Sequence, residues 1–338
     1  MALTESNVAV KMEPRTSDDI AAKRALVFPG QGSQSVGMGK ELSDAYPAAR
    51  EIFQEVDDAL DQNLFKLMCE GPEDQLTLTE NAQPALMAVS MAILNVLRKE
   101  HGIEIPQVGR FVAGHSLGEY TALTAAGSFT VSDAARLLRT RGLAMQTAVP
   151  VGEGAMAALM GLDLETAREV AAEATRDTYD GAVCVAANDN APGQIVISGT
   201  RSAVQRALEI AALRGARRSL MLPVSGPFHC PLMAPVADVM AEALRNVDVK
   251  SPAVPLVSNV TAQPVTEPEQ IRGQLVRQVT GMVRWRESVL FMHSHGVDEL
   301  VEIGTGKVLS GLARRIEKGM RGVSVANPTD LVALIETI

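Results

Sequence analysis

Residues 112–120 read Val112-Ala113-Gly114-His115-Ser116-Leu117-Gly118-Glu119-Tyr120. The apolar run 110–113 predicts a buried strand, and residues 119–126 predict a helix that follows directly. A serine between two glycines at such a turn, G-x-S-x-G, is typical of a nucleophile elbow, because the turn is too tight for side chains at the glycine positions. Ser116 then lies at a helix N-terminus, where backbone N–H groups and the helix dipole can stabilise an oxyanion. The stretch therefore predicts a strand, a turn and a helix that present a reactive serine.

The composition describes a globular chain with room for a large core. Of its 338 residues 46% are hydrophobic, and its apolar runs, such as 85–97, are too short or too mixed to span a bilayer. Residues 1–22 lack the apolar region of a signal peptide and carry several acidic side chains. We expect a disordered leader at 1–22 and no targeting peptide.

Charge and cysteine content restrict the possible partners and the compartment. The formal net charge of −9 makes nucleic acid a poor partner, because phosphate binding needs a basic face. Cys69, Cys184 and Cys230 have no metal-ligand spacing, and their odd number fits a reducing cytoplasm without disulfides. We expect a cytoplasmic protein that contacts neither membrane nor nucleic acid.

The order of predicted elements indicates an α/β fold with two kinds of pattern. The first half has the β-then-α order of a parallel sheet covered by helices: a strand at 24–28, helices at 48–62 and 82–100, the elbow, and a helix ending near 148. Residues 154–222 follow the order βαββαβ, the split pattern of a ferredoxin-like fold. A helix after Pro231 and strands at 255–258 and 297–302 return to the first pattern. We therefore expect an α/β-hydrolase-like large domain at 23–149 and 221–338, with an inserted ferredoxin-like subdomain at 150–220.

An elbow serine needs a base, and His229 is the strongest candidate among the five histidines. It stands in a loop rich in proline and glycine, 222–230, between a predicted strand and a helix, and such connections often hold functional side chains. His115 belongs to the elbow itself. His293 and His295 have no third ligand nearby, so we predict no metal site.

Two other glycine-rich stretches fail the nucleotide-binding motifs that they resemble. After Gly30-Gln31-Gly32-Ser33-Gln34, Ser35 occupies the place of the third glycine of a dinucleotide fingerprint. Around Gly304-Thr305-Gly306-Lys307, Val301 and Val308 replace the first glycine and the Ser or Thr of a phosphate loop. Neither stretch predicts a nucleotide cofactor.

Taken together, the motifs resemble the malonyl-CoA:acyl carrier protein transacylases of type II fatty-acid synthesis and the related polyketide acyltransferase domains. The resemblance covers about 24–316 and rests on ordered motifs at compatible spacing: 28–34, 114–120, Arg141-Gly142, 190–194, the His229 loop, 275–278 and 304–309. Thr305 departs from the proline often seen in the last of these turns, which puts the local rigidity in doubt but not the chemistry.

The resemblance implies a role for each candidate residue. Ser116 would be the nucleophile and His229 its base, and the backbone carbonyl of Gln278 would orient that histidine. Arg141 would grip the free carboxylate of a malonyl group bidentately, which a lysine could not match. The backbone N–H groups of Gln31 and Leu117 would form the oxyanion hole.

Some of these assignments have plainer interpretations. From the residues alone, Arg141 could be a solvated arginine, since Arg136 and Arg139 stand on the same predicted helix. Phe228 resembles the malonyl-selecting residue of the family, because a bulky ring would crowd a 2-methyl branch. Asn188 is a weaker candidate for a substrate contact, since an Asn-Asp-Asn run is more typical of a turn.

The implied reaction is a ping-pong transfer of malonyl from malonyl-CoA to the thiol of holo acyl carrier protein, by a monomer and without a cofactor. An acidic carrier protein needs a basic landing site, and two clusters are candidates: Lys307, Arg314, Arg315 and Lys318, or Arg214, Arg217 and Arg218. Three alternatives stay open: an esterase or thioesterase with the same Ser116 and His229, an acyltransferase of a polyketide pathway, and a non-catalytic module that binds carrier protein.

Overall fold

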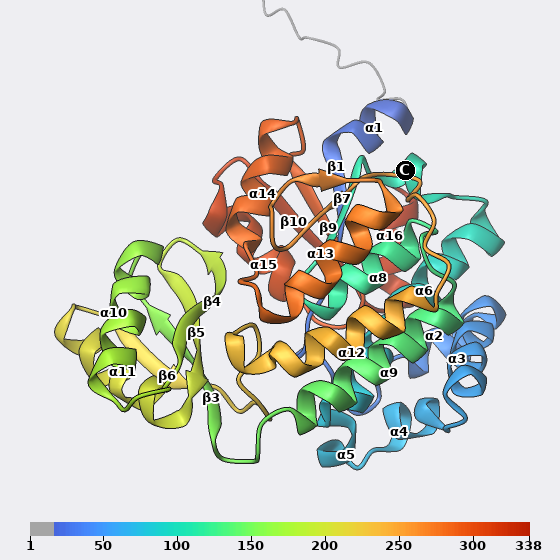
Figure 1. Cartoon of the computed structure of the whole chain (residues 1–338). Coiled ribbons are helices and arrows are strands. Elements are labelled where there is room, and N and C mark those ends of the chain that lie inside the picture. Colours follow the sequence, from blue (N-terminus) through green and yellow to red (C-terminus); the bar gives the residue numbers. More distant parts are fainter. Residues whose placement is uncertain (1–16) are drawn as a thin grey trace, which may run out of the picture.

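A central sheet of mostly parallel strands organises the larger part of the molecule (Figure 1). The computed structural model describes residues 17–338. The strand order is β10-β9-β1-β2-β7-β8, and only β8 runs antiparallel to its neighbour. The strands are β1 (Arg24–Phe28), β2 (Phe111–Gly114), β7 (Leu256–Val257), β8 (Pro264–Val265), β9 (Glu299–Ile303) and β10 (Arg321–Val325).

Side chains of β1 and β2 alternate between two separate cores, one on each face of the sheet. Leu26, Phe28 and Val112 join the larger core, whereas Ala25 and Val27 join the smaller one. Helices α14 (Trp285–Ser294) and α15 (Val308–Ile316) cover the smaller core. The larger core is covered chiefly by α3 (Pro47–Leu60), α6 (Thr79–His101), α8 (Leu117–Ala125), α9 (Val131–Thr147), α12 (Ala234–Arg245) and α13 (Pro268–Thr280). The expected parallel sheet between helices is therefore present.

Shorter helices complete this part of the chain. They are α1 (Ser17–Lys23), α2 (Lys40–Ala45), α4 (Leu64–Glu70), α5 (Glu73–Thr77), α7 (Ile105–Val108), the 3-10 helix η1 (Pro231–Met233) and α16 (Pro328–Ile335). Helix α1 corrects one expectation, because it covers 17–22, the end of the segment expected to be a disordered leader. Residues 1–16 of that segment lie outside the described residues.

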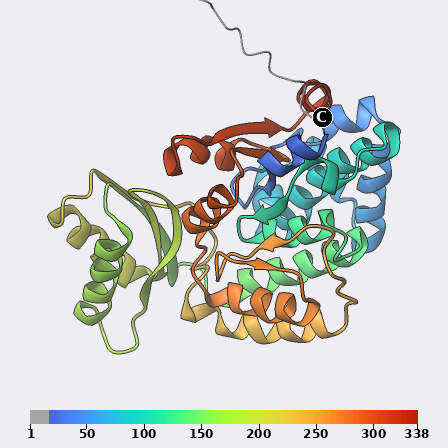
Figure 2. The same cartoon turned by 90° about the horizontal axis from the view of Figure 1, so that it is seen from above.

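The second sheet has four strands in the order β4-β5-β3-β6, and all neighbouring strands are antiparallel. Its elements follow the expected βαββαβ order: β3 (Gly154–Met160), α10 (Leu164–Asp177), β4 (Cys184–Ala191), β5 (Gln194–Thr200), α11 (Arg201–Leu213) and β6 (Arg218–Met221). Figure 2 shows α10 and α11 on the side of this sheet that faces away from the larger part. From the opposite side, Met156 and Val196 join the core of the larger part, so this face closes over it.

None of the helices in the described part of the chain has the length and apolar character needed to cross a membrane. Residues 17–338 also contain no group of three or more His, Cys, Asp or Glu side chains placed to hold a metal ion.

Candidate active site

The expected elbow lies between β2 and α8, at the carboxyl end of the parallel strands. Ser116 has φ 55° and ψ −109°, in a left-handed region that a non-glycine residue rarely adopts. A Cβ atom on Gly114 would lie 1.9 Å from the backbone carbon of Gly118, and one on Gly118 would lie 2.3 Å from the Phe28 carbonyl oxygen. Both glycines are therefore required by the close approach of backbone to backbone.

Asn259, which the sequence did not single out, braces this strained turn. Its Oδ1 accepts a 2.8 Å hydrogen bond from the N–H of Ser116, and its Nδ2 donates to the carbonyl of Gly114 at 2.7 Å. The side chain is fully buried in the loop after β7. One amide thus joins the two sides of the elbow.

Replacing Gly114 with alanine should destabilise the protein by roughly 3 kcal/mol or more, because rigid backbone surrounds the added methyl group. Gly273 is the matched control, since it lies within α13 and, apart from its own chain neighbours and the helix backbone around it, no atom lies within 4 Å of an added Cβ. Alanine at 273 should stabilise the helix by about 0.5–1 kcal/mol. Urea unfolding compares the two, and equal midpoints for Gly114→Ala and wild type would contradict the account of the elbow.

Ser116 and His229 are directly paired. The Ser116 Oγ lies 2.8 Å from His229 Nε2, and the Nδ1 of the same ring lies 2.9 Å from the Gln278 carbonyl and 3.2 Å from that of Gly281. Two carbonyl acceptors require the ring proton to be on Nδ1, which leaves the Nε2 lone pair free to accept the serine proton. The carbonyl of Gln278 stands where the resemblance implied, and Gly281 supplies a second one that was not expected.

His229 is 3% exposed, and this burial is the main reason why its pKa is lowered to about 3. The nearby positive charge of Arg141 lowers that pKa further. The imidazole is therefore neutral and ready to accept a proton at any pH near 7. His115 turns its Nε2 to the Asn190 Oδ1 at 2.9 Å and is not paired with the serine.

Arg141 reaches the same point from α9, and its side chain is only 1% exposed. Its Nη2 donates to Ser116 Oγ at 3.0 Å and to Gln278 Oε1 at 2.8 Å, while its Nη1 donates to Gln83 Oε1 at 2.9 Å. The guanidinium carbon also lies 5.6 Å from the centre of the Tyr120 ring. Burial lowers the pKa of Arg141, yet arginine keeps its proton in proteins.

All the side-chain acceptors around this cation are neutral. Among the side chains of residues 20–338, no carboxylate lies within 4 Å of the Arg141 guanidinium, and its buried Nε has no hydrogen-bond partner. Arg139, on the same helix, pairs instead with Glu80 at 3.1 Å. Arg141 is therefore a buried cation whose charge is available to an anionic ligand.

Gln31 and Leu117, whose N–H groups are the two expected oxyanion donors, line the same cavity as Ser116. Leu117 opens α8, so its N–H has no acceptor within the helix. The loop that carries Gln31 packs on the elbow, because a Cβ on Gly30 would lie 2.9 Å from the carbonyl oxygen of His115. In the part of the chain that the structure describes, neither the Gln31 N–H nor the Leu117 N–H has a hydrogen-bond acceptor.

These residues line one cavity of about 330 Å³ between the two sheets. Ser116, His229 and Arg141 lie on the side of the larger part, and Met156 and Asn188 come from the smaller sheet. Phe228, which resembles the malonyl-selecting residue of the family, and Asn188, the weaker candidate for a substrate contact, line it as well. Each residue predicted to take part in catalysis or to contact the substrate therefore lines this cavity or, like Gln278, contacts a residue that does.

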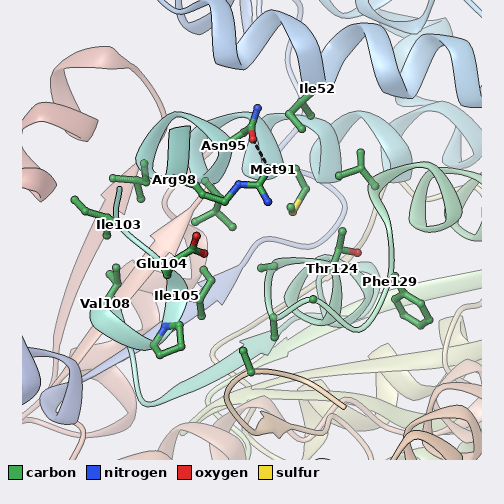
Figure 3. A pocket seen from close by; sticks show the side chains of 18 of the residues that line it. Ile52, Met91, Asn95, Arg98, Ile103, Glu104, Ile105, Val108, Thr124 and Phe129 are labelled. Carbon is green, nitrogen blue, oxygen red and sulfur yellow. Dashed lines mark hydrogen bonds between the residues drawn. The ribbon is translucent and has the colours of Figure 1, made fainter. Parts of the chain in front are cut away.

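A second cavity of about 330 Å³ lies between α6, α7 and the end of α8 (Figure 3). Its walls are mostly apolar, and the Arg98 guanidinium at its edge donates to Asn95 at 2.8 Å. The lining residues include neither a histidine nor a cysteine. With no nucleophile and base pair in its lining, it is not the reactive site.

A serine paired with a histidine at a strand–turn–helix elbow is typical of enzymes that act on acyl groups. Residues 25–335 match the acyl transferase domain family, so the chain belongs to that family and is an acyltransferase. Its full-length relatives include the malonyl CoA-acyl carrier protein transacylases of Bacillus subtilis, 45% identical over 94% of this chain and 98% of the relative, and of Escherichia coli K12, 43% identical over 92% and 98%. The resemblance read from the motifs is confirmed.

Solved structures agree with these relatives. The acyl-carrier-protein S-malonyltransferase of Bartonella henselae is 52% identical, with a TM-score of 0.89 over 93% of this chain and 98% of that one. A malonyl-transacylase in complex with its type II PKS acyl-carrier protein is 41% identical, with a TM-score of 0.89 over 94% of this chain and 100% of that one. The α/β fold expected from the sequence is the fold of these enzymes.

Proposed function

We propose that this chain transfers the malonyl group of malonyl-CoA to the phosphopantetheine thiol of acyl carrier protein through a malonyl ester of Ser116. One observation carries the proposal: the Arg141 guanidinium lies 3.0 Å from the Oγ of a serine that is paired with a histidine. A malonyl group has its carboxylate one methylene away from the reacting carbonyl. A cation beside the nucleophile is therefore well placed for that carboxylate.

In the first half-reaction, His229 Nε2 takes the proton of Ser116 Oγ as the oxygen attacks the thioester carbonyl carbon. The new C–O bond forms while the carbonyl becomes an oxyanion, which accepts from the N–H groups of Gln31 and Leu117. The C–S bond then breaks, and the departing coenzyme A thiolate takes the proton from His229. Ser116 is left as a malonyl ester.

In the second half-reaction, the thiol of the carrier protein gives its proton to His229 and attacks the ester carbonyl. The same oxyanion donors act, and Ser116 Oγ leaves with the proton returned by His229. The step needs no metal or organic cofactor.

Arg141 and Phe228 are the proposed selectivity residues. A substrate carboxylate would replace the contact between Nη2 and Ser116 Oγ, whereas acetyl offers this buried cation nothing. Phe228 is a buried ring in the cavity lining, and it would crowd a 2-methyl branch of methylmalonyl.

Intact-mass spectrometry after brief mixing with malonyl-CoA tests the function. The proposal expects a malonyl increment on the wild-type protein that disappears when holo acyl carrier protein is added and reappears on the carrier protein. Acetyl-CoA and methylmalonyl-CoA, run in parallel, should label the enzyme poorly. Free malonate with no adduct and no loaded carrier protein would instead identify a hydrolase.

Of the two basic clusters, the one on α15 is better placed to receive the acidic carrier protein. Lys307 is exposed and precedes Val308 and Leu309, which line the cavity. Arg214 in the other cluster is already paired with Glu169 and Glu173. We propose that Lys307, Arg314, Arg315 and Lys318 form the docking cluster.

Reversing charge in this cluster should weaken carrier-protein binding without slowing the chemistry. The Lys307→Glu/Arg314→Glu variant is expected to raise the KM for holo carrier protein by roughly tenfold at low salt, because charge complementarity drives the encounter. The Arg214→Glu variant is the matched control, with a KM near that of wild type. If the double variant keeps the wild-type KM, or if it slows acylation of Ser116 by malonyl-CoA, the docking site lies elsewhere.

A further inference from the structure

Glu119 is a buried carboxylate that the proposed mechanism does not use. It lies in the first turn of α8, three residues after Ser116, and is 0% exposed. Its Oε2 accepts from Gln278 Nε2 at 2.5 Å, and its Oε1 accepts from the N–H of Asn259 at 3.3 Å. Burying a carboxylate is costly, so its partners indicate what it holds in place.

Both partners of Glu119 hold the nucleophile elbow. Gln278 Nε2 also donates to the carbonyl of Ser116 at 2.9 Å, and Asn259 Oδ1 accepts from the N–H of the same residue at 2.8 Å. The N–H and the carbonyl of Ser116 are thus each hydrogen-bonded to a side-chain amide, from Asn259 and Gln278 respectively. The Glu119 carboxylate contacts both Asn259 and Gln278.

The carboxylate also decides which way the Gln278 amide faces. The Nε2 group of Gln278 has two hydrogens, and both have acceptors, in Glu119 and in the Ser116 carbonyl. The amide oxygen is therefore left to face Arg141 Nη2, from which it accepts at 2.8 Å. The reversed amide would turn its N–H₂ toward the guanidinium and its oxygen toward a carboxylate, so both contacts would become unfavourable.

We propose that Glu119 is a positioning residue that sets malonyl selectivity, because it locks the Gln278 amide in the orientation that aims the Arg141 guanidinium. This inference rests on the proposed malonyl transfer. This indirect contact, through the Gln278 amide, has a physical advantage over a direct ion pair between Glu119 and Arg141. A carboxylate bonded to Arg141 would compete with the substrate carboxylate, whereas a neutral amide orients the cation and leaves its charge free.

The protonation of Glu119 gives this role a pH signature. Burial raises the pKa of Glu119 to about 7, against the opposing effects of Gln278, Asn259, Ser258 and the Arg141 charge. The groups that face it are Arg141 from α9, Gln278 from α13, Ser258 and Asn259 after β7, and Tyr120 on α8. Below this pH the carboxyl carries a hydrogen of its own and holds the amide less firmly.

These protonation states set the direction in which malonyl transfer changes with pH. Malonyl transfer should be greatest above pH 7 and should fall as the pH falls through about 7. His229 does not titrate in that window, because its pKa is lowered to about 3. A malonyl carboxyl, with a pKa of roughly 3–4, does not titrate there either.

The test is the Glu119→Gln variant of the full chain, with Ser116 acylation followed by quenched intact-mass spectrometry for malonyl-CoA and acetyl-CoA between pH 5.5 and 8.5. We expect malonyl kcat/KM at pH 8 to fall by roughly ten- to a hundredfold, and acetyl kcat/KM to change by no more than about threefold. The fall in malonyl transfer near pH 7 should be absent in the variant. Its thermal midpoint at pH 8, compared with that of wild type, shows whether the variant is folded.

Two further comparisons separate positioning from a general effect on the fold. When Arg141 has already been replaced with alanine, adding Glu119→Gln should not lower malonyl kcat/KM further, since the guanidinium that Glu119 positions is gone. Gln278→Met keeps the backbone carbonyl for His229 and removes the amide, so it should reproduce the loss of selectivity even if Glu119→Gln does not fold. An unchanged ratio of malonyl to acetyl transfer in the soluble variants, or equal losses with both substrates, would overturn the inference. A wild-type protein that forms no malonyl adduct would instead overturn the proposed function.

Discussion

Malonyl loading is expected to vanish when Ser116 is replaced with alanine. The variant loses the oxygen that lies 2.8 Å from His229 Nε2, so no acyl ester can form, and kcat for transfer to carrier protein should fall by roughly 10⁴- to 10⁶-fold. Intact mass after mixing with malonyl-CoA should show the unmodified protein only. The fold should persist, since the Ser116 backbone groups that Asn259 and Gln278 hold are unchanged.

Non-additive losses are expected if Ser116 and His229 act as one catalytic unit. The His229→Ala variant should lose a similar factor in kcat, because the serine then has no acceptor for its proton. The kcat of the double variant should be no lower than that of either single variant. A malonyl increment that survives in Ser116→Ala would place the nucleophile elsewhere. Losses that multiply in the double variant would mean that the two residues act in separate steps.

A change of substrate preference is the expected result of replacing Arg141 with alanine. Malonyl kcat/KM should fall by roughly 10²- to 10⁴-fold, because the substrate carboxylate then enters a buried site without its cation. Acetyl-CoA, which gains nothing from the guanidinium, should lose little, so that the malonyl preference disappears. Competition between the two thioesters, read as the mass of the adduct on Ser116, measures this directly.

Two arginine variants serve as controls for Arg141. Arg141→Lys keeps the charge but cannot present two parallel N–H donors, so it should recover only a small part of malonyl transfer. Arg139 lies on the same helix, but its side chain contacts Glu80, Gln62 and Asn81. The Arg139→Ala variant should therefore keep the malonyl preference of wild type. If Arg141→Ala keeps the wild-type preference for malonyl over acetyl, another group must bind the substrate carboxylate.

Several features could be predicted because they depend on residues that are close in sequence. The elbow needs glycine on both sides of Ser116, and that requirement is visible in five consecutive residues. The periodic spacing of apolar residues predicts the βαββαβ order of the smaller part, and this spacing is a local property of the sequence. His229 stood out because its loop lies between a strand and a helix, and the fold brings its ring to Ser116.

Other features depend on contacts between distant segments, which no local pattern contains. Arg136 is exposed and pairs with Asp133, whereas Arg141 is buried, and from sequence alone the two were alike. Helix α1 lies in a segment whose composition suggested disorder. The preference for the α15 cluster as a docking site came from the ion pairs of Arg214, which link different helices.

The sequence by itself determined the family, the candidate nucleophile and the histidine proposed as its base, because short motifs in a fixed order specify them. Only the tertiary structure decided how these groups act together. Glu119 and Gln278 are 159 positions apart, and Ser116 and Asn259 are 143 apart, yet they meet within hydrogen-bond distance. The physical reason is burial: packing removes water from these polar groups, so each must find its partner inside the protein, and the partners come from whichever elements the fold places beside them.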